Sequence, residues 1–138
     1  TVIKKDPENP HALNFVGYLM SENLGKVEQA YQYIKRAIKI KPDDAYIRDS
    51  LGWYYYRVGN YRKALIELKK AWEKEKKDIT ITKHLAIIYQ ELENDEEAQK
   101  YFAEALRNCE KQSEKEDILR SMQGRILKRL PASLLIEE

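Results

Sequence analysis

The chain has 138 residues, of which 35% are charged, yet its 25 Lys and Arg and 23 Asp and Glu leave a formal net charge of only +2. This balance argues against nucleic acid or an acidic membrane surface as the partner, and no stretch approaches the roughly 20 apolar residues that a transmembrane helix needs. The single cysteine, Cys109, excludes an internal disulfide and favours a reducing compartment.

Residues 1–9, TVIKKDPEN, read as the tail of a preceding structural unit. Val2 and Ile3 would then belong to the trailing helix of that unit, and we expect the sequence to come from a longer array whose targeting signal would lie upstream. Apolar positions at this edge, Leu13 and Val16 among them, are expected to be partly uncovered. Such an edge could associate with a second copy of the chain.

Apolar residues recur at three- and four-residue spacing, with turn signals between the runs, which predicts paired helices and no strands. The expected helices cover residues 10–23, 26–40, 45–58, 61–74, 79–92 and 95–109. Residues suited to helix caps or to a left-handed stop lie between them. These residues are Asn9, Gly59, Asn60, Asp78 and Asn94.

The helix pairs repeat with a period of 34 residues. The positions in register are Ala30, Ala64 and Ala98; Ala37, Ala71 and Ala105; and, for the leading helices, Gly17, Gly52 and Ala86. Gly17 and Gly52 are 35 residues apart, so one extra residue is expected near Ser21–Leu24, where the first helix ends. A fixed period of this size predicts a stacked array.

Residues 113–130 depart from the period and predict one unpaired helix. Its expected apolar face consists of Ile118, Leu119, Met122, Ile126 and Leu130. We expect this helix to cover the apolar edge of the third pair, because the last repeat of an array needs a polar outer side. Pro131 would end it, leaving residues 131–138 as a short tail.

The small residue, the tyrosine three positions later, the two alanines and Pro42 together resemble the tetratricopeptide pattern over roughly residues 1–112. The resemblance implies an all-α, right-handed superhelix of stacked antiparallel helix pairs. It divides the chain into three repeats, 10–44, 45–78 and 79–112, followed by the terminal helix. The family's early tryptophan slot departs from the pattern, since it holds Leu13, Arg48 and Thr82, and Lys76 and Glu110 replace its terminal proline.

In this family the leading helices line a concave groove that holds a protein segment. By analogy the groove positions are Asn14, Tyr18, Asp49, Trp53, Tyr56, Arg57, Lys83, Ile87 and Gln90. Aromatic and arginine side chains are enriched at binding hot spots, and Trp53 is expected to be either a groove contact or a core residue. We expect a partner segment with apolar anchors and some acidic character.

Some members of the family hold the C-terminal carboxylate of heat-shock chaperones through lysine, asparagine and arginine at set groove slots. The corresponding slots here hold Asn14, Tyr18, Ser50, Thr80 and His84. That clamp is not present in these repeats, which argues against a chaperone-tail receptor.

Catalysis needs several groups in one place, and the inventory of such groups is small. His11 and His84 lie in different repeats, without cysteine or paired carboxylates at metal-ligand spacing, and are interpreted as surface or groove residues. Cys109 has no histidine partner in its segment. The basic run Lys35, Arg36, Lys39 and Lys41 lacks the excess charge that phosphate binding needs.

The sequence therefore predicts a protein-binding module or scaffold, with no catalytic residue, cofactor or metal. The alternative is a structural spacer or self-association segment of a larger protein. Similarity to array segments common in bacteria leaves the compartment open between the cytoplasm and the cell envelope.

Overall fold

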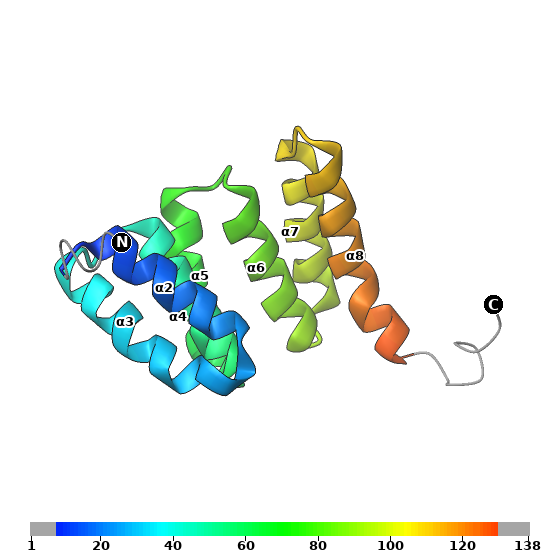
Figure 1. Cartoon of the computed structure of the whole chain (residues 1–138). Helices are drawn as coiled ribbons and strands as arrows, with labels where there is room; N and C mark the ends of the chain where they lie inside the picture. The colour runs from blue at the N-terminus through cyan, green and yellow to red at the C-terminus, as the bar shows by residue number, and fades with distance from the viewer. Residues whose placement is uncertain (1–7, 130–138) are drawn as a thin grey trace. The chain divides into compact units, whose positions relative to one another are not determined.

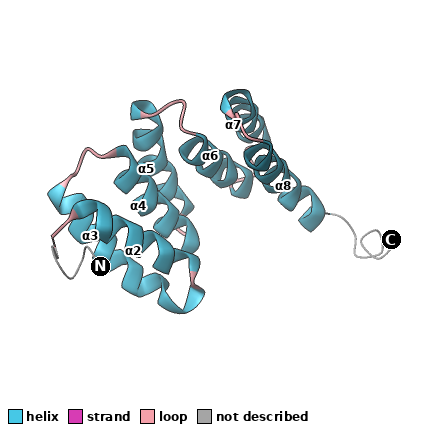
Figure 2. Cartoon of the chain, turned by 45° about the horizontal axis from the view of Figure 1, so that its top comes forward, coloured by secondary structure: helices cyan, strands magenta, loops and turns pink. Residues whose placement is uncertain are grey.

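The computed structural model describes residues 8–129, apart from the side chains of Leu24 and of residues 125–129. The predictions for Val2 and Ile3, for the side chains of Ile126 and Leu130, and for residues 131–138 fall outside this part. Within it the structure is all-α, as predicted, and Figure 2 shows no strand among the described residues. The helices are α2 (Pro10–Glu22), the 3₁₀ helix η1 (Leu24–Lys26), α3 (Val27–Ile40), α4 (Ala45–Arg57), α5 (Tyr61–Lys74), α6 (Ile79–Glu91), α7 (Asp95–Asn108) and α8 (Gln112–Arg129).

The chain divides into two compact units, residues 1–76 and 77–138. In the first unit α2 pairs with α3 and α4 pairs with α5, and α4 packs against both helices of the first pair (Figure 1). The alanines in register are fully buried at the seams of these pairs: Ala30, Ala37, Ala64 and Ala71. The 34-residue period of small residues therefore results from the packing between the two helices of each pair.

Two glycines allow the helices of each pair in the first unit to approach closely. A Cβ atom on Gly17 would lie 2.6 Å from Ile34 Cγ1, and one on Gly52 would lie 2.7 Å from Leu68 Cγ. Contacts this short do not occur between real side chains, so only glycine fits at this approach. In the second compact unit the slot of these glycines holds Ala86, and Phe102 occupies the slot that holds Ile34 or Leu68 in the first unit.

The extra residue of the first repeat lies where the period predicts it. Four residues, 23–26, separate α2 from α3, whereas three residues join α4 to α5 and α6 to α7. Asn23 caps η1 here, because its side chain accepts a hydrogen bond from the Gly25 amide. The additional residue is thus accommodated as a short 3₁₀ turn outside the paired helices.

Helix ends follow the turn chemistry of the sequence. The expected caps Asn9, Asn60, Asp78 and Asn94 each accept a backbone hydrogen bond from the first turn of the following helix. Gly59, with φ of 84°, ends α4 in the left-handed region. The corresponding turn after α6 places a non-glycine residue, Glu93, at φ of 60°.

In the second compact unit α6 and α7 form an antiparallel pair, and α8 packs against both of them (Figure 1). The helix α8 is therefore related to this pair as α4 is related to α2 and α3. Counting 34 residues on from Ala86 gives Arg120, which is exposed. The small residue that would let a trailing helix pack closely against α8 is therefore missing at this slot. The helix α8 thus departs from the repeat pattern at this slot.

The apolar face of α8 is narrower than expected. Ile118 is fully buried and Met122 is half-buried, but Leu119 is 37% exposed. A side chain one position along a helix points about 100° away, so Ile118 and Leu119 cannot both face α6 and α7. The expectation that Leu13 is partly uncovered is also wrong, because Leu13 is fully buried against Ala37 and Ile47.

Candidate partner-binding face

The indole of Trp53 ties α4 to α2 within the first compact unit. Its Nε1 donates a hydrogen bond to Glu22 Oε1 at 2.7 Å, and its ring stacks on Tyr56 with ring centres 4.5 Å apart. Only 8% of Trp53 is exposed. Trp53 therefore contributes to the contact between the two helix pairs of this unit, since Glu22 comes from the preceding pair.

Arg57 supports the same junction one turn further along α4. Its Nε donates to the Ser21 carbonyl at 3.1 Å, and a terminal nitrogen donates to the Glu22 carbonyl at 3.4 Å. These carbonyls lie at the C-terminal end of α2, where a cation is electrostatically favoured. Arg57 is half-buried, so its guanidinium both caps α2 and remains partly accessible.

The other predicted groove residues of the first unit differ in accessibility. Asp49 is buried, whereas Asn14, Tyr18 and Tyr56 are half-buried. Among the described residues none donates a hydrogen bond to the buried Oδ1 of Asn14. Tyr18 and Tyr56 therefore supply the accessible aromatic surface of this face.

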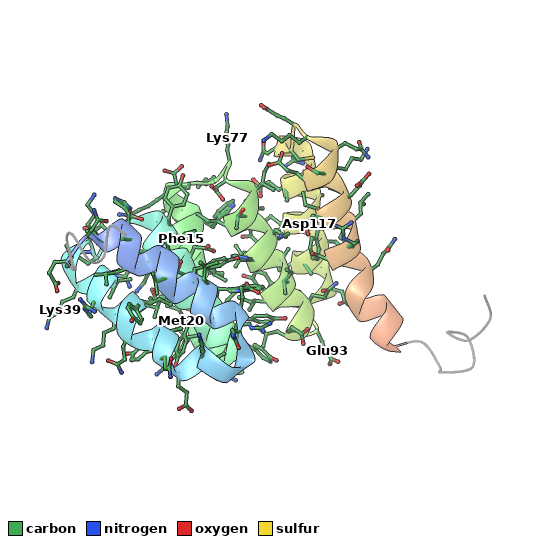
Figure 3. The ribbon with its side chains drawn as sticks, in the orientation of Figure 1. Phe15, Met20, Lys39, Lys77, Glu93 and Asp117 are labelled. Atoms are coloured by element: carbon green, nitrogen blue, oxygen red, sulfur yellow. The ribbon has the colours of Figure 1, made fainter. Side chains whose placement is uncertain are left out.

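In the second unit the helix α8 engages two of the three predicted groove residues. Lys83 forms an ion pair with Asp117, which Figure 3 labels on α8, and Gln90 Nε2 donates to the Met122 carbonyl at 3.1 Å. Ile87 is half-buried. Lys83 and Gln90 thus hold the terminal helix in place.

Sequence reasoning did not identify Glu22, Asp117 or Met122 as polar partners of the groove positions. For Asp117 a signal was present, because Asp117 lies 34 residues after Lys83, in the same slot of the period. Equivalent slots on adjacent leading helices are neighbours in a stacked array, and opposite charges in them pair. Glu22 carried no such signal, since its role depends on the direction in which the Trp53 ring points.

Three tyrosines form a cluster between α3 and α4. Tyr31 stacks on Tyr54 with ring centres 5.1 Å apart, and the Tyr54 and Tyr55 rings are tilted at 5.5 Å. Burial raises the pKa of Tyr54 and of Tyr55, and the nearby Tyr31 raises both pKa values further. Tyr54 and Tyr55 therefore pack against neighbouring rings of the first unit.

The two histidines and the cysteine, which are the residues considered for catalysis or metal binding, do not form a common site among the described residues. His11 is exposed on α2, whereas His84, expected at the surface or in the groove, is buried. The thiol of Cys109 donates to the Leu106 carbonyl at 3.1 Å. The described residues contain no group of three or more His, Cys, Asp or Glu side chains placed to hold a metal ion.

A surface hollow of about 380 Å³ in the first unit is lined by Pro42, Asp43, Arg48, Lys70, Glu73 and Lys74. Its cations are paired rather than directed at a common point. Arg48 donates to Glu67 at 2.8 Å, Lys70 lies 3.8 Å from the same carboxylate, and Lys74 donates to the Asp43 carbonyl. The hollow therefore lacks the unpaired positive charge that an anion site needs.

None of the helices between residues 8 and 129 combines the length and the apolar character required to cross a bilayer.

The fold is that of a helix-pair repeat protein, in which the two helices of a pair pack closely at small residues that recur at a fixed period. The profile of the tetratricopeptide repeat matches residues 15–120, more than half of the chain. The chain belongs to the tetratricopeptide-repeat family.

One relative is the TPR repeat-containing protein PA4667 of Pseudomonas aeruginosa, which is 37% identical over 73 residues. This alignment spans 53% of the chain and only 12% of the length of that relative. A bacterial origin of the chain fits this match. The crystal structure of MamA is similar with a TM-score of 0.65 and 15% identity, covering 92% of this chain and 82% of the MamA chain. At that identity the likeness shows the fold.

Proposed function

We propose that the chain is a protein-binding module whose leading helices hold an extended or helical segment of a partner. Members of the tetratricopeptide-repeat family commonly mediate protein–protein interaction, and the chain belongs to that family. The proposal includes no catalytic step and no cofactor.

The observation that carries the proposal is the pair of half-buried tyrosines, Tyr18 and Tyr56, on α2 and α4 of one compact unit. Tyrosine offers a large rigid surface with a polar end, which suits recognition at low entropic cost. Trp53 stacks against Tyr56 and thereby fixes its ring. We therefore assign direct contact to Tyr18 and Tyr56, and a supporting role to Trp53.

Charge favours a partner segment with acidic residues. Residues 1–76 contain 15 Lys and Arg against 10 Asp and Glu, a net charge of +5, whereas residues 77–138 contain 10 against 13, a net charge of −3. Arg57 adds a half-buried guanidinium on the α4 helix that carries Tyr56. A positive field increases the association rate of an acidic segment and makes it depend on salt.

The proposal can be tested with the 138-residue chain as bait for a displayed library of random peptides. We expect enrichment of peptides that combine apolar or aromatic residues with Asp or Glu. Fluorescence anisotropy on an enriched peptide should show that Tyr18→Ala and Tyr56→Ala each weaken binding by about tenfold or more. Ile66→Ala, which alters an exposed apolar side chain on α5, is the matched control and should leave affinity unchanged.

A library without enrichment, or an affinity that Tyr18→Ala and Tyr56→Ala leave unchanged, would contradict the proposal. The second candidate function, a structural spacer or self-association segment, would then be favoured. It is supported by a different observation, the exposed apolar side chains of α2.

A further inference from the structure

The exposed residues of α2 form a single stripe along the helix. They are His11, Phe15, Leu19 and Glu22, at spacings of four, four and three residues. Phe15, labelled in Figure 3, is 64% exposed and Leu19 is 51% exposed. Because residues four apart on a helix are neighbours, these two side chains form one contiguous apolar patch, and such patches, unlike single exposed side chains, mark interaction sites.

The period shows what covers these two slots elsewhere in the chain. In α4 the slots hold Ser50, which is buried, and Tyr54, which stacks on Tyr31 of α3. In α8 they hold Ile118, which is fully buried, and Met122, which is half-buried. A leading helix of this fold therefore packs a neighbouring helix against the stripe, and α2 presents the stripe exposed.

The charges of α2 favour a second copy of the same helix. Among the described α-helices α2 alone contains neither Lys nor Arg, so two α2 helices can approach without repulsion between cations. The stripe begins with His11 and ends with Glu22. In an antiparallel pair, His11 of one copy lies beside Glu22 of the other, and Phe15 lies beside Leu19. Antiparallel helix dipoles are also mutually favourable.

We infer that the α2 stripe is a self-association face, and that two copies of the chain pair through it with their α2 helices antiparallel. The interface is isologous, so it closes as a dimer and does not propagate into a filament. The inference does not depend on peptide binding by Tyr18 and Tyr56, and its test is separate from the library experiment.

Sedimentation velocity on the 138-residue chain from about 1 μM to about 1 mM tests the inference, because an interface of this small size should dissociate within that range. We expect a monomer–dimer equilibrium. Phe15→Glu and Leu19→Glu, tested separately, should each raise the dissociation constant about tenfold or more. Both side chains are exposed, so both variants should fold, which circular dichroism would verify.

Ile66→Glu is the matched control, since Ile66 is 54% exposed on α5 and lies outside the stripe. It should leave the equilibrium unchanged. A chain that stays monomeric throughout the range would overturn the inference and leave the stripe for a helix of another sequence. A dimer that both stripe variants preserve would also overturn it.

The orientation can be tested by disulfide cross-linking in a Cys109→Ser background. His11 and Glu22 are 11 residues apart, about 16 Å along the helix, whereas a disulfide requires Cα atoms within about 7 Å. The antiparallel pair predicts that His11→Cys cross-links efficiently with Glu22→Cys in a mixture, and that neither cross-links with itself. Efficient cross-linking of His11→Cys with itself would contradict the antiparallel arrangement.

Discussion

Trp53 shows how one side chain can occupy a groove position and still contribute to folding. It lies on the leading helix α4, but its indole donates to Glu22 of the preceding pair and is only 8% exposed. Replacing it removes packing surface and a hydrogen bond to a charged acceptor together. Effects of Trp53 variants on partner binding therefore have to be separated from their effects on stability.

We predict that Trp53→Ala lowers the free energy of unfolding by about 3–5 kcal/mol, as is typical when a buried tryptophan is truncated. Trp53→Phe should cost less, because it keeps an aromatic ring beside Tyr56 and loses the donor to Glu22. Urea unfolding followed by circular dichroism measures both. Tyr46→Ala, on the exposed side of α4, is the control. Equal midpoints for Trp53→Ala and the unmodified chain would assign Trp53 to the groove.

The raised pKa values of Tyr54 and Tyr55 make stability depend on alkaline pH. The unfolded chain releases these phenolic protons near pH 10, whereas the folded chain retains them to a higher pH. Because the unfolded state then binds fewer protons, stability falls as the pH rises above about 10. The melting temperature should therefore decrease from that pH upward, and less steeply in Tyr54→Phe. An identical decrease in both proteins would contradict this assignment.

At the scale of the helix pair, the approach of α4 to α5 depends on the absence of a side chain at Gly52. A Cβ atom there would meet both Leu68 Cγ at 2.7 Å and the Ala64 carbonyl oxygen at 3.2 Å. The backbone oxygen cannot move independently of α5, so the helices must separate.

We predict that Gly52→Ala destabilises the chain by about 1–3 kcal/mol, the usual cost of overpacking, although alanine favours helix. Gly124→Ala is the matched control, because a Cβ atom on Gly124 would have no neighbour within 4 Å. That variant should stabilise α8 by up to about 1 kcal/mol. Thermal melting of both variants provides the comparison, and a stabilising effect of Gly52→Ala would contradict the packing argument.

Among the described side chains of the terminal helix α8, Ile118 is the fully buried apolar one, and polar contacts join the helix to α6. We predict that Ile118→Ala costs about 2–5 kcal/mol, whereas Leu119→Ala, at a 37% exposed position, costs well under half as much. A chain that ends at Gln112 should melt at a lower temperature and associate. If that shortened chain keeps its melting temperature and stays monomeric, α8 is not a cap.

At the scale of the whole molecule, residues able to perform chemistry are dispersed between the two compact units. His11 lies in the first unit, whereas His84 and Cys109 lie in the second. Elemental analysis of protein purified without added metal should find no stoichiometric zinc or iron. Metal that is present and is lost on changing His11 or His84 would overturn the non-catalytic proposal.

Much of the fold could be predicted from the sequence by itself. The 34-residue period, the caps and the left-handed Gly59 predict the helix pairs, their boundaries and the position of the extra residue. Helix boundaries depend on neighbours within one or two turns, and helix pairing depends on contacts that every repeat makes alike. Both kinds of information are therefore present in the local sequence. Residues 113–130 were also predicted to form a helix, because the repeat pattern changes after Gln112.

Only the tertiary structure decided which side chains are accessible. Trp53 is buried, and its indole donates a hydrogen bond to Glu22, 31 residues earlier in the chain. Lys83 forms an ion pair with Asp117 of α8. Phe15 is exposed, whereas Leu13 is fully buried. A periodic pattern specifies the slot that a residue occupies. Exposure depends on the side chains that distant segments bring to that slot, and these differ from one repeat to the next.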